Sequence, residues 1–126
     1  MANLHVLEKL QASNPKAEIW WDSSPLVYAT WAKGVLAKAS PEKQAAWGAQ
    51  LARLFDPAQP EKTLFRGVTT NPPLSLAAIK DDPAGWGKVV RGLIEEHPGQ
   101  GVEEIYWLTY KQVVAKGAQF FRPIWE

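Results

Sequence analysis

Hydrophobic residues recur at helical spacing along most of the chain. After the polar start Ser40-Pro41-Glu42, apolar residues stand at i, i+4, i+7 and i+8, which places them on one helix face: Trp47, Leu51, Leu54 and Phe55. Ser40 is expected to cap this helix with its hydroxyl, ahead of Pro41 at the first helical position. Comparable patterns predict six helices, over residues 2–13, 25–38, 41–55, 73–80, 83–96 and 102–121.

Three of these helices carry more specific expectations. Ser24 precedes Pro25 and is expected to cap the second helix. In the fifth helix, four apolar residues are expected on the buried side: Trp86, Val90, Leu93 and Ile94. In the last helix, apolar residues are spread around the circumference: Ile105, Leu108, Tyr110, Val113 and Val114. Such a helix is expected to be well buried, or to be buried by a partner.

Two short apolar runs interrupt the helical pattern and predict β-strands. One covers residues 19–22 and ends in Asp22; the other covers residues 64–68 and includes Gly67. Pro72 and Pro73 stop the second run, because proline cannot donate to a strand ladder. Helices between successive strands imply right-handed crossovers and a parallel pair. The chain is therefore predicted to be a helix-rich α/β protein with about two parallel strands, forming a single domain over residues 1–126.

The composition of the chain argues against several classes of function. A length of 126 residues with 46% hydrophobic residues suits one domain with its own core. Fourteen basic and thirteen acidic residues give a net charge of +1, which argues against a dedicated nucleic-acid partner. Without cysteine, disulfides, thiolate metal sites and cysteine nucleophiles are excluded, and the two histidines make a multi-histidine metal site improbable.

Targeting segments and membrane contact are not predicted either. The N-terminus mixes charged and apolar residues without a continuous apolar core, and no run approaches the roughly 20 apolar residues of a membrane span. A cytoplasmic protein without membrane contact is expected. Seven tryptophans leave two interpretations open: large core residues, or an apolar surface that meets a partner.

The candidate chemistry lies at the ends of the two predicted strands. Asp22 ends the first strand, and Thr69, Thr70 and Asn71 follow the second. Because carboxyl ends of adjacent parallel strands meet at one edge of a sheet, Asp22 and Asn71 are expected to point into one crevice. Structural roles remain as alternatives: Asp22 as a helix cap or turn residue, Asn71 as a turn residue before Pro72, and the threonines as ordinary strand residues.

Three segments resemble the transaldolase family. The run Gly67–Leu74, GVTTNPPL, is similar to the family signature at the end of its second barrel strand. Glu18–Asp22, EIWWD, resembles the first strand, which ends in an aspartate, and Glu103–Glu126 resembles the long helix that leads toward the third strand. The long connection between the strands resembles the longer bacterial members.

The resemblance implies a fold and a reaction. It implies that the chain is the N-terminal part of a (β/α) TIM barrel. Family members transfer a dihydroxyacetone unit between sugar phosphates in the pentose phosphate pathway, through a Schiff base on a lysine and without cofactor or metal. Asp22 would be the catalytic acid/base, and Asn71, Thr69 and Thr70 would bind the substrate.

The Schiff-base lysine of the family does not map onto this chain. It belongs to a fourth strand, and this sequence ends at Glu126 before the third. A closed eight-stranded barrel needs roughly 200 residues or more, and two parallel strands with open edges make a poor free-standing sheet. The chain is therefore expected to be inactive alone, and either to self-associate or to dock with a chain that supplies the remaining strands. The alternatives are a non-catalytic interaction or structural subunit and, less strongly indicated, a sugar-phosphate binding module.

Overall fold

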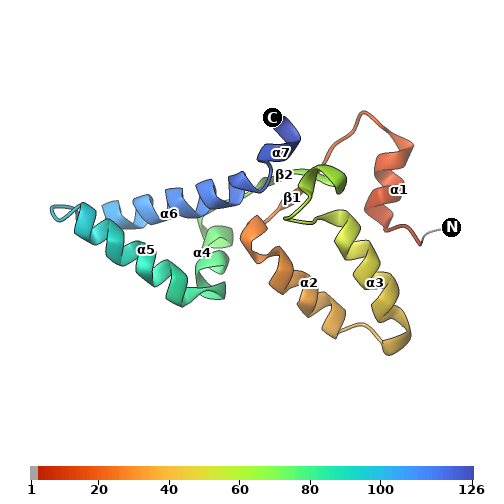
Figure 1. The fold of residues 1–126 in the computed structure, drawn as a ribbon, viewed down its shortest axis with the longest axis horizontal. Helices are drawn as coiled ribbons and strands as arrows, with labels where there is room; N and C mark the ends of the chain where they lie inside the picture. The colour runs from red at the N-terminus through yellow and green to blue at the C-terminus, as the bar shows by residue number, and fades with distance from the viewer. Residues whose placement is uncertain (1–2) are drawn as a thin grey trace.

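A two-stranded parallel sheet joins two groups of helices (Figure 1). The computed structural model of the protein describes residues 3–126. The elements are α1 Val6–Ser13, β1 Ile19–Asp22, the 3-10 turn η1 Pro25–Val27, α2 Tyr28–Ala37, α3 Pro41–Leu54, the 3-10 turn η2 Pro60–Lys62, β2 Phe65–Thr69, α4 Pro72–Asp81, α5 Pro83–Glu96, α6 Val102–Gln119 and α7 Arg122–Trp125. The prediction of a helix-rich α/β chain with a small parallel sheet is confirmed.

The predicted elements are present, with differences at their ends. Residue 2, at the start of the first predicted helix, lies outside the described residues, and α1 begins at Val6 with His5 as its cap. Ser24 and Ser40 occupy cap positions but make no capping hydrogen bond, so that part of the prediction is wrong. The Ser40 hydroxyl instead donates to the Glu42 carboxylate at 2.5 Å, in a charge-assisted hydrogen bond.

The sheet register includes one irregularity that sets which side chains share a face. Ile19 pairs with Phe65, but Trp20 pairs with Gly67, so Arg66 is passed over. Beyond this bulge, Asp22 pairs with Thr69. One face of the sheet therefore packs into the core through Ile19, Trp21, Phe65 and Val68, and the other carries Trp20, Asp22, Gly67 and Thr69.

The larger core lies between the sheet and helices α2, α3 and α7. Phe55 is at its centre, with ring centroids 5.2 Å from Tyr28 and 5.1 Å from Phe121. The Tyr28 hydroxyl donates to the carbonyl of Leu51, and burial raises the pKa of that hydroxyl to about 12. The buried members are Tyr28, Leu51, Leu54, Phe55, Phe65 and Phe121.

A second core joins α4, α5 and α6 around Ala78, Trp86 and Val113. In Figure 1, α5 and α6 run side by side as a long hairpin, away from α2 and α3. Trp86 and Leu93 are buried as expected, but Ile94 is 51% exposed, so its predicted burial is wrong. Trp86 and Leu93 are seven residues apart and share one line along α5, whereas Ile94 is turned by a further 100°.

Helix α1 is held to α3 by an ion pair with a pH-dependent strength. Arg53 donates from Nε to Glu8 Oε1 at 2.7 Å and from a terminal nitrogen to Asn3 O at 3.0 Å. The hydrogen bond from Arg53, with a smaller contribution from the His5 N–H, lowers the pKa of the Glu8 carboxyl below its ordinary value of 4.5. The ionised carboxylate therefore stabilises the folded chain.

We expect Glu8→Gln to lower the free energy of unfolding near neutral pH by no more than about 1 kcal/mol, because the pair is partly exposed. A lowered folded-state pKa means that the contribution is present above the unfolded pKa and is lost as the pH falls through the folded one. Urea titrations at about pH 7 and about pH 3 should therefore show a larger difference from the wild type at the higher pH. The exposed Glu95→Gln is the control, and an equal deficit at both pH values would contradict the ion-pair explanation.

Candidate functional site

The candidate site lies on the sheet face that the larger core leaves uncovered. Along β1 this face carries Trp20 and Asp22, and along β2 it carries Gly67 and Thr69. Trp20 is 50% exposed, and Asp22 and Thr69 are exposed as well. In α/β proteins, ligands bind at the carboxyl ends of parallel strands, and this sheet face is open there.

Trp20 and Gly67 lie side by side on this face. A Cβ atom added at Gly67 would lie 2.7 Å from a carbon of the Trp20 ring, so only glycine lets the indole lie across the neighbouring strand. The indole Nε1 donates to Glu18 at 2.9 Å, which holds the ring in this orientation. The close approach explains the glycine in the middle of the second strand.

Asp22 and Thr69 meet across the ends of the two strands. The Thr69 hydroxyl donates to Asp22 Oδ1 at 2.9 Å, and the Ser23 N–H donates to the Thr69 carbonyl, also at 2.9 Å. The capping role considered for Asp22 is not seen, because η1 begins without a side-chain cap bond. The structure thus brings together two of the predicted site residues and leaves the second carboxylate oxygen open to solvent.

Asn71 has the turn role that was considered for it, as the cap of α4. Its side-chain oxygen accepts the N–H of Leu74 at 3.0 Å, and Pro72 and Pro73 follow in the first helical turn. The amide nitrogen is not used by this cap. Asn71 is exposed at the same edge of the sheet as Asp22, so the capping bond holds the residue in place and its amide nitrogen remains a donor for a ligand.

Thr70 contacts α4 and not Asp22. Its hydroxyl lies 3.2 Å from the hydroxyl of Ser75, which is 2% exposed, and the Ser75 N–H donates to the Asn71 carbonyl. This pair ties the strand end to α4. Ser75 was missed by the sequence reasoning, although its position four residues after Asn71, one turn into the helix, was a usable signal.

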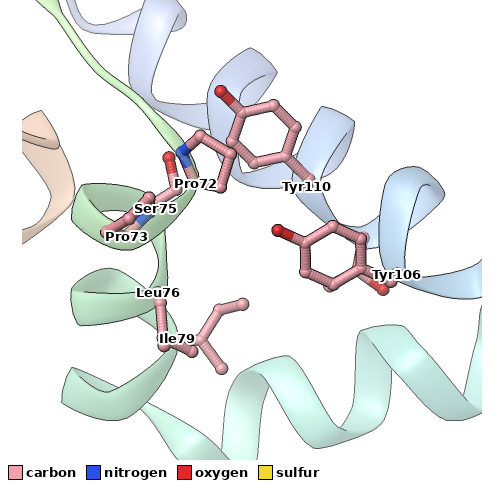
Figure 2. A pocket seen from close by; sticks show the side chains of 8 residues that line it. Pro72, Pro73, Ser75, Leu76, Ile79, Tyr106 and Tyr110 are labelled. Atoms are coloured by element: carbon pink, nitrogen blue, oxygen red, sulfur yellow. The ribbon is translucent and has the colours of Figure 1, made fainter. Parts of the chain in front are cut away.

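Next to this strand end, α4 and α6 enclose an apolar hollow of about 270 Å³. Figure 2 shows Tyr106 and Tyr110 of α6 on one side and Leu76 and Ile79 of α4 on the other. The remaining lining residues are Pro72, Pro73, Ser75 and Thr109. A lining this apolar does not suit a sugar phosphate.

A larger hollow of about 580 Å³ opens on the sheet face that carries Trp21 and Phe65, beside α1, α2 and α3. Three indoles line it, from Trp21, Trp31 and Trp47, together with His5 and Gln50. Of the seven tryptophans, only Trp86 is buried, while Trp20, Trp31, Trp107 and Trp125 are each more than 40% exposed. The interpretation as a core residue therefore holds for Trp86, and a partner surface formed by the exposed tryptophans stays a prediction.

Schiff-base chemistry and metal binding find no support within residues 3–126. Every lysine there is exposed, whereas a Schiff-base lysine must be partly removed from water. Within the same residues, no cluster of three or more histidine, aspartate and glutamate side chains could hold a metal ion. No helix of this part of the chain is long and apolar enough to cross a membrane.

The geometry at the strand ends can orient a ligand and exchange a proton with it. Asp22 supplies a carboxylate, Asn71 an amide donor, and Thr69 fixes the carboxylate rotamer. Comparison with known proteins adds no family to this description. No protein-family model, no curated protein and no solved structure matches the chain.

Proposed function

We propose that this chain supplies the first two strands of a transaldolase-like barrel and contributes Asp22 and Asn71 to its active site. The reaction would be the transfer of a dihydroxyacetone unit between sugar phosphates. The observation that supports this most directly is the Thr69–Asp22 hydrogen bond at the carboxyl ends of paired parallel strands, with Asn71 at the start of the next helix. In a (β/α) barrel, active sites are built at that end of the strands.

The uncovered sheet face also fits a barrel interior. In such barrels, helices cover the outer face of the strands, and the inner face is filled by side chains from other strands. Here α2, α3 and α7 cover the face with Trp21 and Phe65, and the face with Trp20 and Asp22 lies open. Further strands beside β1 and β2 would cover Trp20 and enclose Asp22.

In this proposal each residue has a separate role. Asp22 would accept and return the proton of the substrate hydroxyl during carbon–carbon cleavage, and Thr69 would orient its carboxylate. Asn71 would donate to a substrate oxygen. The nucleophilic lysine would come from another strand, because the lysines of residues 3–126 are all on exposed surface. Borohydride treatment of this chain with fructose 6-phosphate should therefore leave its intact mass unchanged.

We expect Asn71→Asp to abolish sugar-phosphate binding without loss of stability. An aspartate still accepts the Leu74 N–H and caps α4, but it replaces the amide donor with a negative charge. Amide chemical shifts of the ¹⁵N-labelled chain report binding of fructose 6-phosphate, and shifts are expected at Ser23, Thr70 and Asn71 in the wild type only. Unfolding in urea should give the same midpoint for both proteins.

Shifts that are absent in the wild type, or that appear only around the tryptophan-lined hollow, would contradict the proposed site. Asn71→Ala is the comparison for stability, since it removes cap and donor together and should cost about 1 kcal/mol.

A non-catalytic interaction subunit is the second candidate. It is favoured by one observation, the exposure of Trp20, Trp31, Trp107 and Trp125 on a chain of this size. Tryptophan is enriched at protein–protein interfaces. This candidate predicts a stable complex that forms equally well with Asp22→Asn and Asn71→Asp, and no response to sugar phosphates.

A further inference from the structure

One side of α6 is an apolar stripe that the described residues leave uncovered. The residues that α6 buries recur every four positions, at Ile105, Thr109, Val113 and Gly117. On another side of the same helix, Trp107 and Val114 are 45% and 36% exposed, and Tyr106, which is 48% exposed, points into the hollow between α4 and α6. The sequence predicted a helix that is apolar on more than one side, and the structure covers only one of them.

Trp107 of this stripe packs beside the two tyrosines that line the hollow between α4 and α6. The Trp107 ring centroid lies 5.1 Å from that of Tyr106 and 5.8 Å from that of Tyr110, both edge to face. A Trp or Tyr side chain buries about 150–250 Å² when it is covered, so half-exposed rings and Val114 together present a few hundred Å² of apolar area. The largest apolar patch on a monomeric protein is of this size and is often functional.

The charged residues beside the stripe are arranged so that they complement the same residues of a second copy. Glu104 lies three positions before Trp107, and Lys111 lies four positions after it. Because they are seven residues apart, both fall on the same line along the helix, next to the tryptophan. Both side chains are exposed, and within residues 3–126 neither forms an ion pair.

We propose that the α6 stripe is a homodimer surface, on which a second copy of the chain packs its own α6 in antiparallel orientation with the two Trp107 rings at the centre. An antiparallel arrangement brings Glu104 of each copy beside Lys111 of the other, and forms two equivalent ion pairs about a two-fold axis. In a parallel pair about a two-fold axis, the flank with Glu104 and Lys111 would face the opposite flank of the partner helix, and these two ion pairs would not form. The charge order therefore selects one orientation and one partner, a second copy.

This interface leaves the proposed active site free. The stripe lies on α6, and the sheet face with Asp22 is formed by β1 and β2. Dimerisation through α6 and addition of strands to the sheet can therefore occur in the same assembly, and the two proposals can fail separately.

Charge reversal on the full chain tests the proposal. Sedimentation velocity over a concentration series should show a monomer–dimer equilibrium for the wild type. Glu104→Lys alone and Lys111→Glu alone should each weaken dimerisation by about tenfold or more, because each replaces two attractive pairs with two repulsive ones. An equimolar mixture of the two variants should form a heterodimer with wild-type affinity, since every pair is then attractive again.

Controls separate this interface from others. Lys43→Glu makes the same charge change on exposed α3 and should leave the dimer intact. Trp107→Ala should give a monomer with an unchanged circular dichroism spectrum, because Trp107 is half exposed. A wild type that is monomeric at all concentrations would overturn the proposal. So would a dimer that ignores both single reversals, or a mixture that associates no better than either variant alone.

Discussion

Truncation of Phe55 to alanine should cause the largest loss of stability of any single substitution considered for this chain. Phe55 is 2% exposed, and its ring contacts those of Tyr28, Phe65 and Phe121. Phe-to-Ala substitutions in cores cost about 3–5 kcal/mol, and whole domains are stable by only about 5–15 kcal/mol. We therefore expect Phe55→Ala to leave the chain partly unfolded at room temperature.

Urea unfolding followed by circular dichroism measures this effect, with Ile94→Ala as the matched control. Ile94 is also a large apolar residue but is 51% exposed, so its truncation should change the free energy of unfolding by no more than about 0.5 kcal/mol. If Phe55→Ala gives no folded baseline, Phe55→Leu keeps most of the volume and should show a smaller loss that can be measured. Equal midpoints for Phe55→Leu, Ile94→Ala and the wild type would contradict the assignment of Phe55 to the centre of the core.

The packing of aromatic rings around Phe55 also explains how a two-stranded sheet is stable. An isolated parallel pair of this length has little stability of its own. Here Trp21 and Phe65 stack across the pair with centroids 6.1 Å apart, and Tyr28 and Phe55 pack against Phe65. The aromatic core therefore holds the strands from one side and leaves the other side free for Asp22 and Thr69.

Local signals in the sequence were sufficient to locate the elements. Apolar periodicity and proline at helix starts located six helices, and two apolar runs located the strands. The short helix α7 was not predicted, because a four-residue helix that contains Pro123 carries no periodic pattern. Cap bonds were predicted less well. Ser40 has the residue type of a cap, but its hydroxyl donates to Glu42 and its oxygen accepts no helix N–H, which residue type alone does not decide.

The candidate site was predicted in part. The strand ends bring Asp22 and Thr69 together, whereas a crevice shared by Asp22 and Asn71 stays a prediction. It was not possible to tell Thr69 from Thr70, because the bulge at Arg66 sets which of them shares a face with Asp22. The position of Ser75 beside Thr70 depends on how α4 leaves the sheet, which is a property of tertiary packing.

For α6, too, the sequence pattern does not decide which sides of the helix are covered. Its sequence shows apolar residues on more than one side, and that pattern is compatible with a central helix of a larger core. The structure shows that Ile105 and Val113 are covered and that Trp107 and Val114 are not. Periodicity gives the faces of a helix, and the neighbouring elements decide which face is covered.

Replacement of Asp22 by asparagine should abolish most of the transfer activity of the proposed assembly. Asparagine has the same shape, and its side-chain oxygen can still accept the Thr69 hydroxyl, so the strand pair should remain intact. It cannot accept a proton at neutral pH, and general acid/base groups contribute about 10²- to 10⁴-fold to rate. We therefore expect a loss of kcat in that range, with little change in the affinity for fructose 6-phosphate.

The measurement requires the lysine-bearing strand. The chain would be mixed with a fragment of a known transaldolase that carries the third to eighth strands, and the complex would be isolated by size-exclusion chromatography before its transfer rate is measured. Glu18→Gln is the control, because Glu18 loses the same charge four residues upstream while its side chain can still accept the Trp20 indole. Asp22→Asn as active as Glu18→Gln would show that Asp22 is not the acid/base residue, and an isolated wild-type complex without activity would contradict the proposed assembly. Activity that falls with Asp22→Asn and with Thr69→Val, but not with Glu18→Gln, would place the reacting proton at the pair that joins the two strands.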